Sequence, residues 1–167
     1  MFERRLVYVR APLDDRRASE VTAQLMTMDA EGDDPVSVLI DCADATLDGA
    51  FAVVDTIDLL GVPVHATCIG RVEGPAVAVV AVADLRRASP NARIRLCAPR
   101  TDAAPPVRDV EGWLSQRRER FERFLDRLAR ASGQPIARIR EDVTRGRSLD
   151  AREAARYGLI DEVVARP

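Results

Sequence analysis

Hydrophobic residues along the first hundred positions follow two patterns: short apolar runs, and residues spaced three or four apart. Short runs are typical of strands, and the wider spacing is typical of helices that bury one face. Ala18, Val21, Leu25 and Met28, for example, follow the helical spacing. This part of the chain therefore predicts strands at 6–9, 36–40, 62–69, 85–88 and 94–97, and helices at 14–28, 49–60 and 75–83.

The last third of the chain is predicted to be mostly helical. An apolar stripe from Val110 to Leu128 indicates a long helix at 109–131, which Gly133 ends. Asp150 and Glu153 have the spacing of a capping box, which marks the start of a helix. The further elements predicted here are helices at 135–143 and 151–157 and a strand at 159–164.

Alternation of strands and helices over the first hundred residues favours βαβ units and a mainly parallel sheet. The predicted fold class is therefore α/β. A domain of about 150 residues buries roughly 68–70% of its unfolded surface, so a chain of 167 residues is long enough for one core. Because no internal repeat and no linker divides the chain, we predict a single domain over 1–167.

Charge is unevenly distributed, although the formal net charge is only −2. Residues 1–60 carry 13 acidic residues and 5 arginines, a net of −8, whereas residues 71–167 carry 14 acidic residues and 20 arginines, a net of +6. A basic half is a feature of nucleic-acid binding. Here the arginines alternate with Asp and Glu on predicted helix faces, so we expect solvated faces and no nucleic-acid partner. Opposite net charges in the two parts of the chain would also suit head-to-tail packing between subunits.

Cysteine usage indicates a reducing compartment. Cys42, Cys68 and Cys97 lie in apolar runs and form no CxxC pair, so we expect buried free thiols. The chain shows no signal peptide and no apolar run of about 18 residues. We therefore expect a cytoplasmic protein that does not cross a membrane. His65 is the only histidine, and its spacing to Asp and Cys predicts no metal site.

Six short strings add a more specific signal: AQL at 23–25, VVDTI at 53–57, TCIG at 67–70, SPN at 89–91, SGQP at 132–135 and EAARYGLID at 153–161. In these strings and in the order of its elements, the chain resembles the proteolytic subunit of the ATP-dependent Clp protease (ClpP) from about residue 3 to 165. The resemblance implies a ClpP/crotonase-like fold of stacked ββα units with a protruding arm and long helix at about 100–131. It also implies heptameric rings that stack through that arm and helix.

The resemblance further locates the catalytic positions of such a peptidase, and most of them have lost their chemistry. The nucleophile position falls at Gly74, which has no side chain, and the base position falls at Cys97. Asp142, at the acid position, alone keeps its residue type. The oxyanion donors fall at Pro75, which has no N–H, and at Ala45, where the family has a glycine. Loss of one such donor typically costs about 2.7–4 kcal/mol of transition-state stabilisation, so the resemblance implies a vestigial triad.

Other residues are poor substitutes for the missing groups. Cys97 would need a base to form a thiolate, and the register places His65 away from the site. Glu73 fits a carboxylate at the rim, although as a general base it would make the protein a crotonase-type lyase or hydratase. Asp142 fits a helix-end residue kept for hydrogen bonds or charge pairing. None of these roles for Cys97, Glu73 and Asp142 requires a cofactor, so we expect none.

The family's docking pocket for its ATPase partner also differs here. The matching positions are Ser37, Leu39, Leu59 and Thr67, and two of them are polar where the family pocket is apolar and aromatic. Docking of a Clp ATPase is therefore expected to be weakened or altered. The arm between rings is glycine-rich in the family, whereas residues 100–106 contain two prolines and no glycine, so ring stacking is expected to differ.

Three functions are compatible with the sequence. The first is a non-catalytic ClpP-like protein, structural or regulatory, that forms homo-oligomers or mixed rings with active ClpP subunits. The second is a crotonase-type enzyme, with Glu73 as its base, or a ligand-binding module in the old cleft. The third is a stand-alone binding protein with its own oligomeric state. A lost triad within an intact fold signature favours the first.

Overall fold

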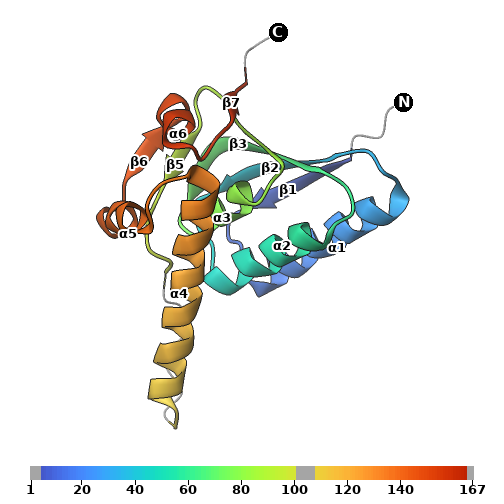
Figure 1. Ribbon diagram of the computed structural model, residues 1–167. Coiled ribbons are helices and arrows are strands. Elements are labelled where there is room, and N and C mark those ends of the chain that lie inside the picture. Colours follow the sequence, from blue (N-terminus) through green and yellow to red (C-terminus); the bar gives the residue numbers. More distant parts are fainter. Residues whose placement is uncertain (1–4, 101–107, 165–167) are drawn as a thin grey trace.

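Figure 1 shows a computed structural model of the chain, which describes residues 5–100 and 108–164. The helices are α1 (Asp15–Glu31), α2 (Leu47–Leu59), α3 (Ala76–Ala81), α4 (Val110–Ser132), α5 (Ile136–Arg145) and α6 (Ala151–Tyr157). The strands are β1 (Leu6–Arg10), β2 (Val36–Cys42), β3 (Val64–Glu73), β4 (Leu85–Ala88), β5 (Arg93–Arg95), β6 (Ser148–Asp150) and β7 (Glu162–Val163). Most of the predicted arm lies outside the described residues.

Within the described residues, the seven strands form one sheet. Its main order is β1-β2-β3-β4-β7, and all of these neighbours run parallel. Strand β5 also pairs in parallel with β3, and only the β5–β6 pair is antiparallel. The predicted α/β class with a mainly parallel sheet is therefore confirmed.

Strand β3 connects the two parts of this sheet. Its first half pairs with β4 and its last three residues pair with β5. The change of partner occurs at Gly70, whose φ is +64° and whose Cβ, if present, would lie 2.5 Å from Asp41 Oδ1. The Asp41 carboxylate accepts a hydrogen bond from the N–H of Arg71 at 3.0 Å. Residues 70–73 follow the strand predicted at 62–69 and were assigned to no element. They form the end of β3, because this glycine permits a bend without ending the pairing.

Helices cover one face of the sheet. Alternate residues of β1 and β2 are fully buried, among them Val7, Val9, Val38 and Ile40, and α1 and α2 lie together on this side (Figure 1). The intervening residues point the other way and are only partly covered, and the side chain of Tyr8 is 42% exposed. This part of the sheet therefore has one covered and one open face.

Helix α3 consists of small apolar residues that are all buried over 76–80. A helix of this composition has no wet face and must lie inside the protein. It packs against both α2 and α4, which confirms the prediction of a buried helix at this place.

Helix α4 is buried only toward its C-terminal end. Phe124, Leu125 and Leu128 belong to the core, whereas Val110 and Leu114 are exposed. Figure 1 shows the N-terminal half of α4 extending away from the body of the molecule. The predicted long helix is thus confirmed, and its apolar stripe continues beyond the part that this chain covers. Over the described residues, no helix combines the length and apolar character that crossing a membrane requires.

Arg86 ties the last elements to the sheet. Its Nη1 donates to the carbonyl oxygens of Ala131 at 2.8 Å and Gly158 at 2.9 Å, near the ends of α4 and α6. Its Nε donates to Asp161 Oδ2 at 3.1 Å, and this guanidinium holds the pKa of the Asp161 carboxyl below its usual value. One arginine therefore positions residues 158–161, the end of the EAARYGLID string.

Gly158 is the position in this region that is least tolerant of a side chain. Its φ is +95°, and a Cβ would overlap the carbonyl oxygen of Ser132. Gly133 also has a positive φ, +69°, but a Cβ there would meet open space. We therefore expect Gly133→Ala to lower the free energy of unfolding by about 1 kcal/mol, the cost of the left-handed conformation. Gly158→Ala should lower it by at least about 3 kcal/mol. Urea denaturation of both variants checks this, and equal losses would contradict it.

Candidate functional site

Three parallel strands end at the same edge of the sheet. Cys42 at the end of β2 is in register with Val72 of β3, and Glu73 of β3 is in register with Arg95 of β5. The segments that follow these strands, 43–46, 74–75 and 96–98, therefore leave the sheet side by side. In open α/β sheets ligands bind at this carboxyl edge. The predicted positions Ala45, Gly74, Pro75 and Cys97 all lie on these segments.

Gly74 and Cys97 are neighbours at this edge. A Cβ on Gly74 would lie 3.4 Å from Cys97 Sγ, in ordinary van der Waals contact. Gly74 has a φ of +57°, and its N–H donates to the carbonyl oxygen of Arg95 at 3.0 Å. Pro75 follows as the N-cap of α3. The structure thus brings together the two positions that the resemblance assigns to nucleophile and base, and it places an imino acid without a donor directly after the first.

Asp44 and Ala45 belong to the segment that follows β2, and this segment is tied to Leu13. Ala45 is buried and forms a bridge with Leu13, whose N–H donates to the carbonyl oxygen of Asp44 at 2.9 Å. The Asp44 carboxylate forms an ion pair with Arg100 at 3.2 Å. Because Asp44 follows β2 and Arg100 follows β5, this ion pair joins the two segments that border the edge.

The three thiols differ in accessibility. Burial raises the pKa of Cys42 to about 11 and that of Cys68 to about 12, and both are fully buried as predicted. Cys97 is half-buried, so the prediction of three buried thiols is wrong for this residue, whose run ends at the sheet edge. Burial also raises the pKa of Cys97, although the nearby Arg95 opposes the shift. A thiol of this kind is not an activated nucleophile.

Neither Glu73 nor His65, the remaining titratable candidates, is arranged as a general base beside Gly74. The Glu73 side chain is 19% exposed and lies between Arg71 at 3.6 Å and Arg95 at 3.9 Å. His65 lies near the opposite end of β3, in register with Ser37. Within the described residues, no group of three His, Cys, Asp or Glu side chains could hold a metal ion.

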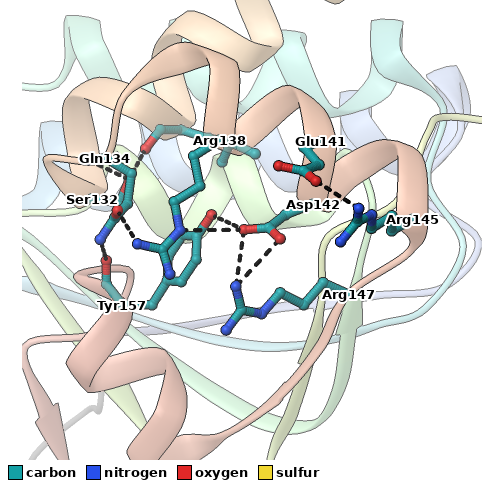
Figure 2. Close-up of polar contacts among 9 residues, drawn as sticks. Ser132, Gln134, Arg138, Glu141, Asp142, Arg145, Arg147 and Tyr157 are labelled. Atoms are coloured by element: carbon teal, nitrogen blue, oxygen red, sulfur yellow. Dashed lines mark hydrogen bonds and ion pairs between the residues drawn. The ribbon is translucent and has the colours of Figure 1, made fainter.

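Asp142 is held in a separate polar cluster, shown in Figure 2. The Tyr157 hydroxyl donates to Asp142 Oδ2 at 2.7 Å, and Arg147 Nη1 donates to both carboxylate oxygens at 3.1 and 3.3 Å. Arg138 approaches the same carboxylate at 3.8 Å, and both guanidiniums lie 5.3 Å from the centre of the Tyr157 ring. Burial and the bond to Asp142 raise the pKa of Tyr157 well above its usual value. The Asp142 carboxylate therefore pairs with Tyr157, Arg147 and Arg138. None of these contacts involves Cys97.

Gly146, rather than Asp142, lies beside Cys97. Strand β6 is antiparallel to β5, and extending its register by two residues places Gly146 opposite Cys97. In agreement, the Leu96 N–H donates to the carbonyl oxygen of Arg147 at 2.8 Å. Arg95 Nε donates to the Gly146 carbonyl oxygen at 3.2 Å, and a Cβ on Gly146 would lie 3.0 Å from Arg95 Nη2. The assignment of the acid position to Asp142 stays a prediction, and these contacts do not support it.

The predicted docking residues fall in two places. Leu39 of β2 and Thr67 of β3 are in register on the open face of the sheet, and Ser37 lies two residues before Leu39 on the same face. Leu59, at the end of α2, is 85% exposed. The open face therefore carries three of the four positions, with Tyr8 in register with Leu39 as a neighbour that the sequence analysis did not select.

A cleft of about 870 Å³ adjoins the site, and sequence reasoning did not find it. It lies between the N-terminal ends of α1 and α2 and the protruding half of α4. Trp113, Phe121 and Leu47 supply apolar walls, and Arg100 and Arg118 supply charge. Its size is within the range of small-molecule sites. The signal was weak in the sequence because the walls come from four separate segments.

The mainly parallel sheet, with its candidate site at the carboxyl edge, is that of an α/β protein. Comparison with known proteins identifies the family. The chain matches the model of the Clp protease family over residues 1–167, and it belongs to that family. It is 34% identical over 171 residues to the ATP-dependent Clp protease proteolytic subunit 1 of Nocardia farcinica, covering 96% of this chain and 83% of the relative. It is 30% identical to proteolytic subunit 4 of Streptomyces avermitilis, covering 99% of this chain and 75% of the relative.

The Tyr157 hydroxyl should contribute measurably to stability. Hydrogen bonds to a charged group contribute roughly 1.5–3 kcal/mol, so we expect Tyr157→Phe to lower the free energy of unfolding by about that amount at pH 7. Tyr8→Phe, on the open face, is the control and should change it by less than about 0.5 kcal/mol.

The same pair of variants has a pH signature. Folded Tyr157 keeps its proton, whereas the unfolded chain releases it above about pH 10, which favours unfolding. Stability should therefore fall above pH 10 more steeply in the unmodified chain than in Tyr157→Phe, as followed by urea denaturation. Identical behaviour of Tyr157→Phe and Tyr8→Phe would contradict the role given to this hydroxyl.

Cys97 should be the one thiol that reacts in the folded protein. Iodoacetamide at pH 8 should add a single adduct at Cys97, more slowly than to free cysteine because burial raises the pKa of this thiol. Cys42 and Cys68 should react only after unfolding. Intact-mass and peptide spectrometry provide the measurement, with Cys97→Ala as the control that stays unlabelled. Labelling of Cys97 faster than free cysteine would instead indicate an activated thiolate.

Proposed function

We propose that this chain is a member of the Clp protease family without peptidase activity, which acts as a structural or regulatory partner of active proteolytic subunits. The observation that carries the proposal is the Gly74-Pro75 pair at the carboxyl edge of β3. A peptidase of this type needs a side-chain nucleophile and main-chain donors for the oxyanion. Gly74 has no side chain to attack a peptide bond, and Pro75 has no N–H to donate.

The neighbouring groups support the same conclusion. Cys97 stands where a base would be needed, and its thiol is neutral because burial raises its pKa. Asp142 is occupied by Tyr157 and Arg147. The ion pair between Asp44 and Arg100 joins the segments between which an extended peptide would have to lie. Even if a nucleophile were supplied, the groups that must position and stabilise the reacting atoms are missing.

Two uncovered surfaces support assembly with other subunits. Parallel sheets almost always have both faces covered, yet the face that carries Tyr8 and Leu39 is open in this chain. The N-terminal half of α4 presents Val110 and Leu114 to solvent on a helix that extends from the body. Both features suit a subunit of a larger ring, formed by this chain alone or together with active subunits.

Docking of a Clp ATPase is a weaker part of this proposal. Ser37 and Thr67 make the open face more polar than a purely apolar docking pocket, and Leu59 is the exposed apolar contribution from α2. We therefore propose that an ATPase, if it binds a mixed ring, is held mainly by the active subunits.

A peptidase assay tests the loss of catalysis. The chain should hydrolyse no fluorogenic peptide above the buffer rate, and Gly74→Ser should stay inactive because Pro75 still lacks a donor. An active proteolytic subunit assayed in parallel is the positive control. Turnover by the unmodified chain that disappears in Cys97→Ala or Asp142→Ala would reject the proposal.

The assembly part is tested separately by light scattering at micromolar concentration. We expect a mass well above that of a dimer, either for the chain alone or after mixing with an active subunit. A monomer or dimer under both conditions would exclude a role in rings.

A ligand-binding function is a second candidate, and the cleft of about 870 Å³ beside Ala98–Arg100 is the observation that favours it. Saturable binding of a small ligand that Trp113→Ala abolishes, in a chain that stays monomeric, would support this candidate over the first.

A further inference from the structure

Asp48 is the only aspartate in the chain that is followed by glycine. Such a pair can rearrange without an enzyme. The glycine nitrogen gives up its proton and attacks Cγ of the aspartate, and one water leaves as a succinimide ring forms. Water then opens the ring at either carbonyl, which returns aspartate or gives isoaspartate. A following glycine favours the reaction because it has no Cβ to obstruct the ring and has wide backbone freedom.

The fold requires glycine at position 49, so packing maintains the susceptible pair. Gly49 is buried in the first turn of α2. A Cβ there would lie 2.5 Å from the carbonyl oxygen of Leu13 and 2.9 Å from Thr46 Oγ1, too close for a carbon atom in both cases. The same Leu13 oxygen accepts the N–H of Thr46 at 3.0 Å, which fixes the start of α2 against the connection between β1 and α1. Any other residue at 49 would therefore have to move α2 away from this connection.

The side chain of Asp48, in contrast, is accessible to solvent. It is 61% exposed and lines the cleft of about 870 Å³. Arg120 of α4 forms an ion pair with its carboxylate, but this arginine is itself 50% exposed, and exposed ion pairs restrain their partners only weakly. Water, which must open the succinimide ring, therefore reaches this position.

The nitrogen of Gly49 is protected while α2 is intact. Its N–H donates to Thr46 Oγ1 at 3.0 Å, and Thr46 is the N-cap of the helix. This hydrogen bond engages the proton that the reaction must remove and holds the nitrogen in the helical turn, away from Cγ of Asp48. Rearrangement therefore requires the first turn of α2 to open, and helix ends open locally far more often than the whole protein unfolds.

We propose that Asp48–Gly49 is a site of spontaneous isoaspartate formation in this chain, and that Thr46 is the positioning residue that suppresses the reaction. Isoaspartate has one more carbon in the main chain than aspartate, so the product displaces the Gly49 N–H from Thr46 and the carboxylate from Arg120. The cap of α2 and the ion pair between α2 and α4 are then lost together, at the wall of the cleft. The inference goes beyond the proposed function and needs neither a partner subunit nor catalysis.

The rate of isoaspartate formation at Asp48 tests the proposal. The full chain is incubated at pH 7, and the product is located by peptide mapping after labelling with an isoaspartate-specific methyltransferase. Thr46→Ala removes the cap, so isoaspartate should accumulate about fivefold faster, the increase in the open population that loss of an N-cap typically produces. Thr46→Ser keeps the hydroxyl and should react at the rate of the unmodified chain. Asp48→Glu, whose longer side chain does not form the five-membered ring, should give no product at this position.

Two controls separate opening of α2 from general loss of stability. Tyr157→Phe weakens the fold through the cluster that joins α5 and α6, and it should leave the rate at Asp48 unchanged. The chain unfolded in guanidinium chloride should react faster than every folded variant, because nothing then holds the Gly49 nitrogen.

Three results would overturn the inference. The first is an equal rate in the folded and unfolded chain, and the second is no isoaspartate at Asp48 even in the unfolded chain. The third is equal acceleration by Thr46→Ala and Tyr157→Phe, which would remove the role given to the cap. None of these results bears on peptidase activity or assembly, so the proposed function stands or fails separately.

Discussion

Pairing along β3 is the constraint on which the rest of the structure depends. This strand pairs with β2 over 64–68 and again at Val72, with β4 over its first half and with β5 at its end. The change of partner is possible because Gly70 bends the chain toward Asp41, whose carboxylate accepts the N–H of Arg71. Without that bend, β5 would not reach the carboxyl edge, and Gly74 and Cys97 would not be neighbours.

Elements with a strong local pattern could be predicted from the sequence, whereas an element without one could not. The small apolar composition of α3, the stripe of α4 and the Asp150/Glu153 capping box are each properties of consecutive residues. Strand β6 has three residues, too few to show a period, and it exists because β5 lies opposite it. The extension of β3 through 70–73 was missed for a related reason, since Gly70 is a common signal for a turn.

The same distinction applies to the candidate site, where some features depend on residue type and others on neighbours distant in the sequence. The absence of a side chain at Gly74 and of an N–H at Pro75 follows from residue type alone, so both are visible in the sequence. The half-exposed state of Cys97 and the direction of the Asp142 side chain could not, because they depend on neighbours distant in the sequence, such as Tyr157. The position of Gly146 opposite Cys97 follows from an antiparallel register that no local pattern indicates.

The arginine that lies against Gly146 restricts what this position could become. Gly146 has a φ of +69°, and the guanidinium of Arg95 lies in the space into which a side chain at this position would extend. Any larger residue there would have to adopt the left-handed backbone and move this guanidinium at the same time. A carboxylate introduced at 146 would pair with the arginine that it meets, so its charge would be neutralised at the edge of the sheet instead of being free to orient a neighbouring group.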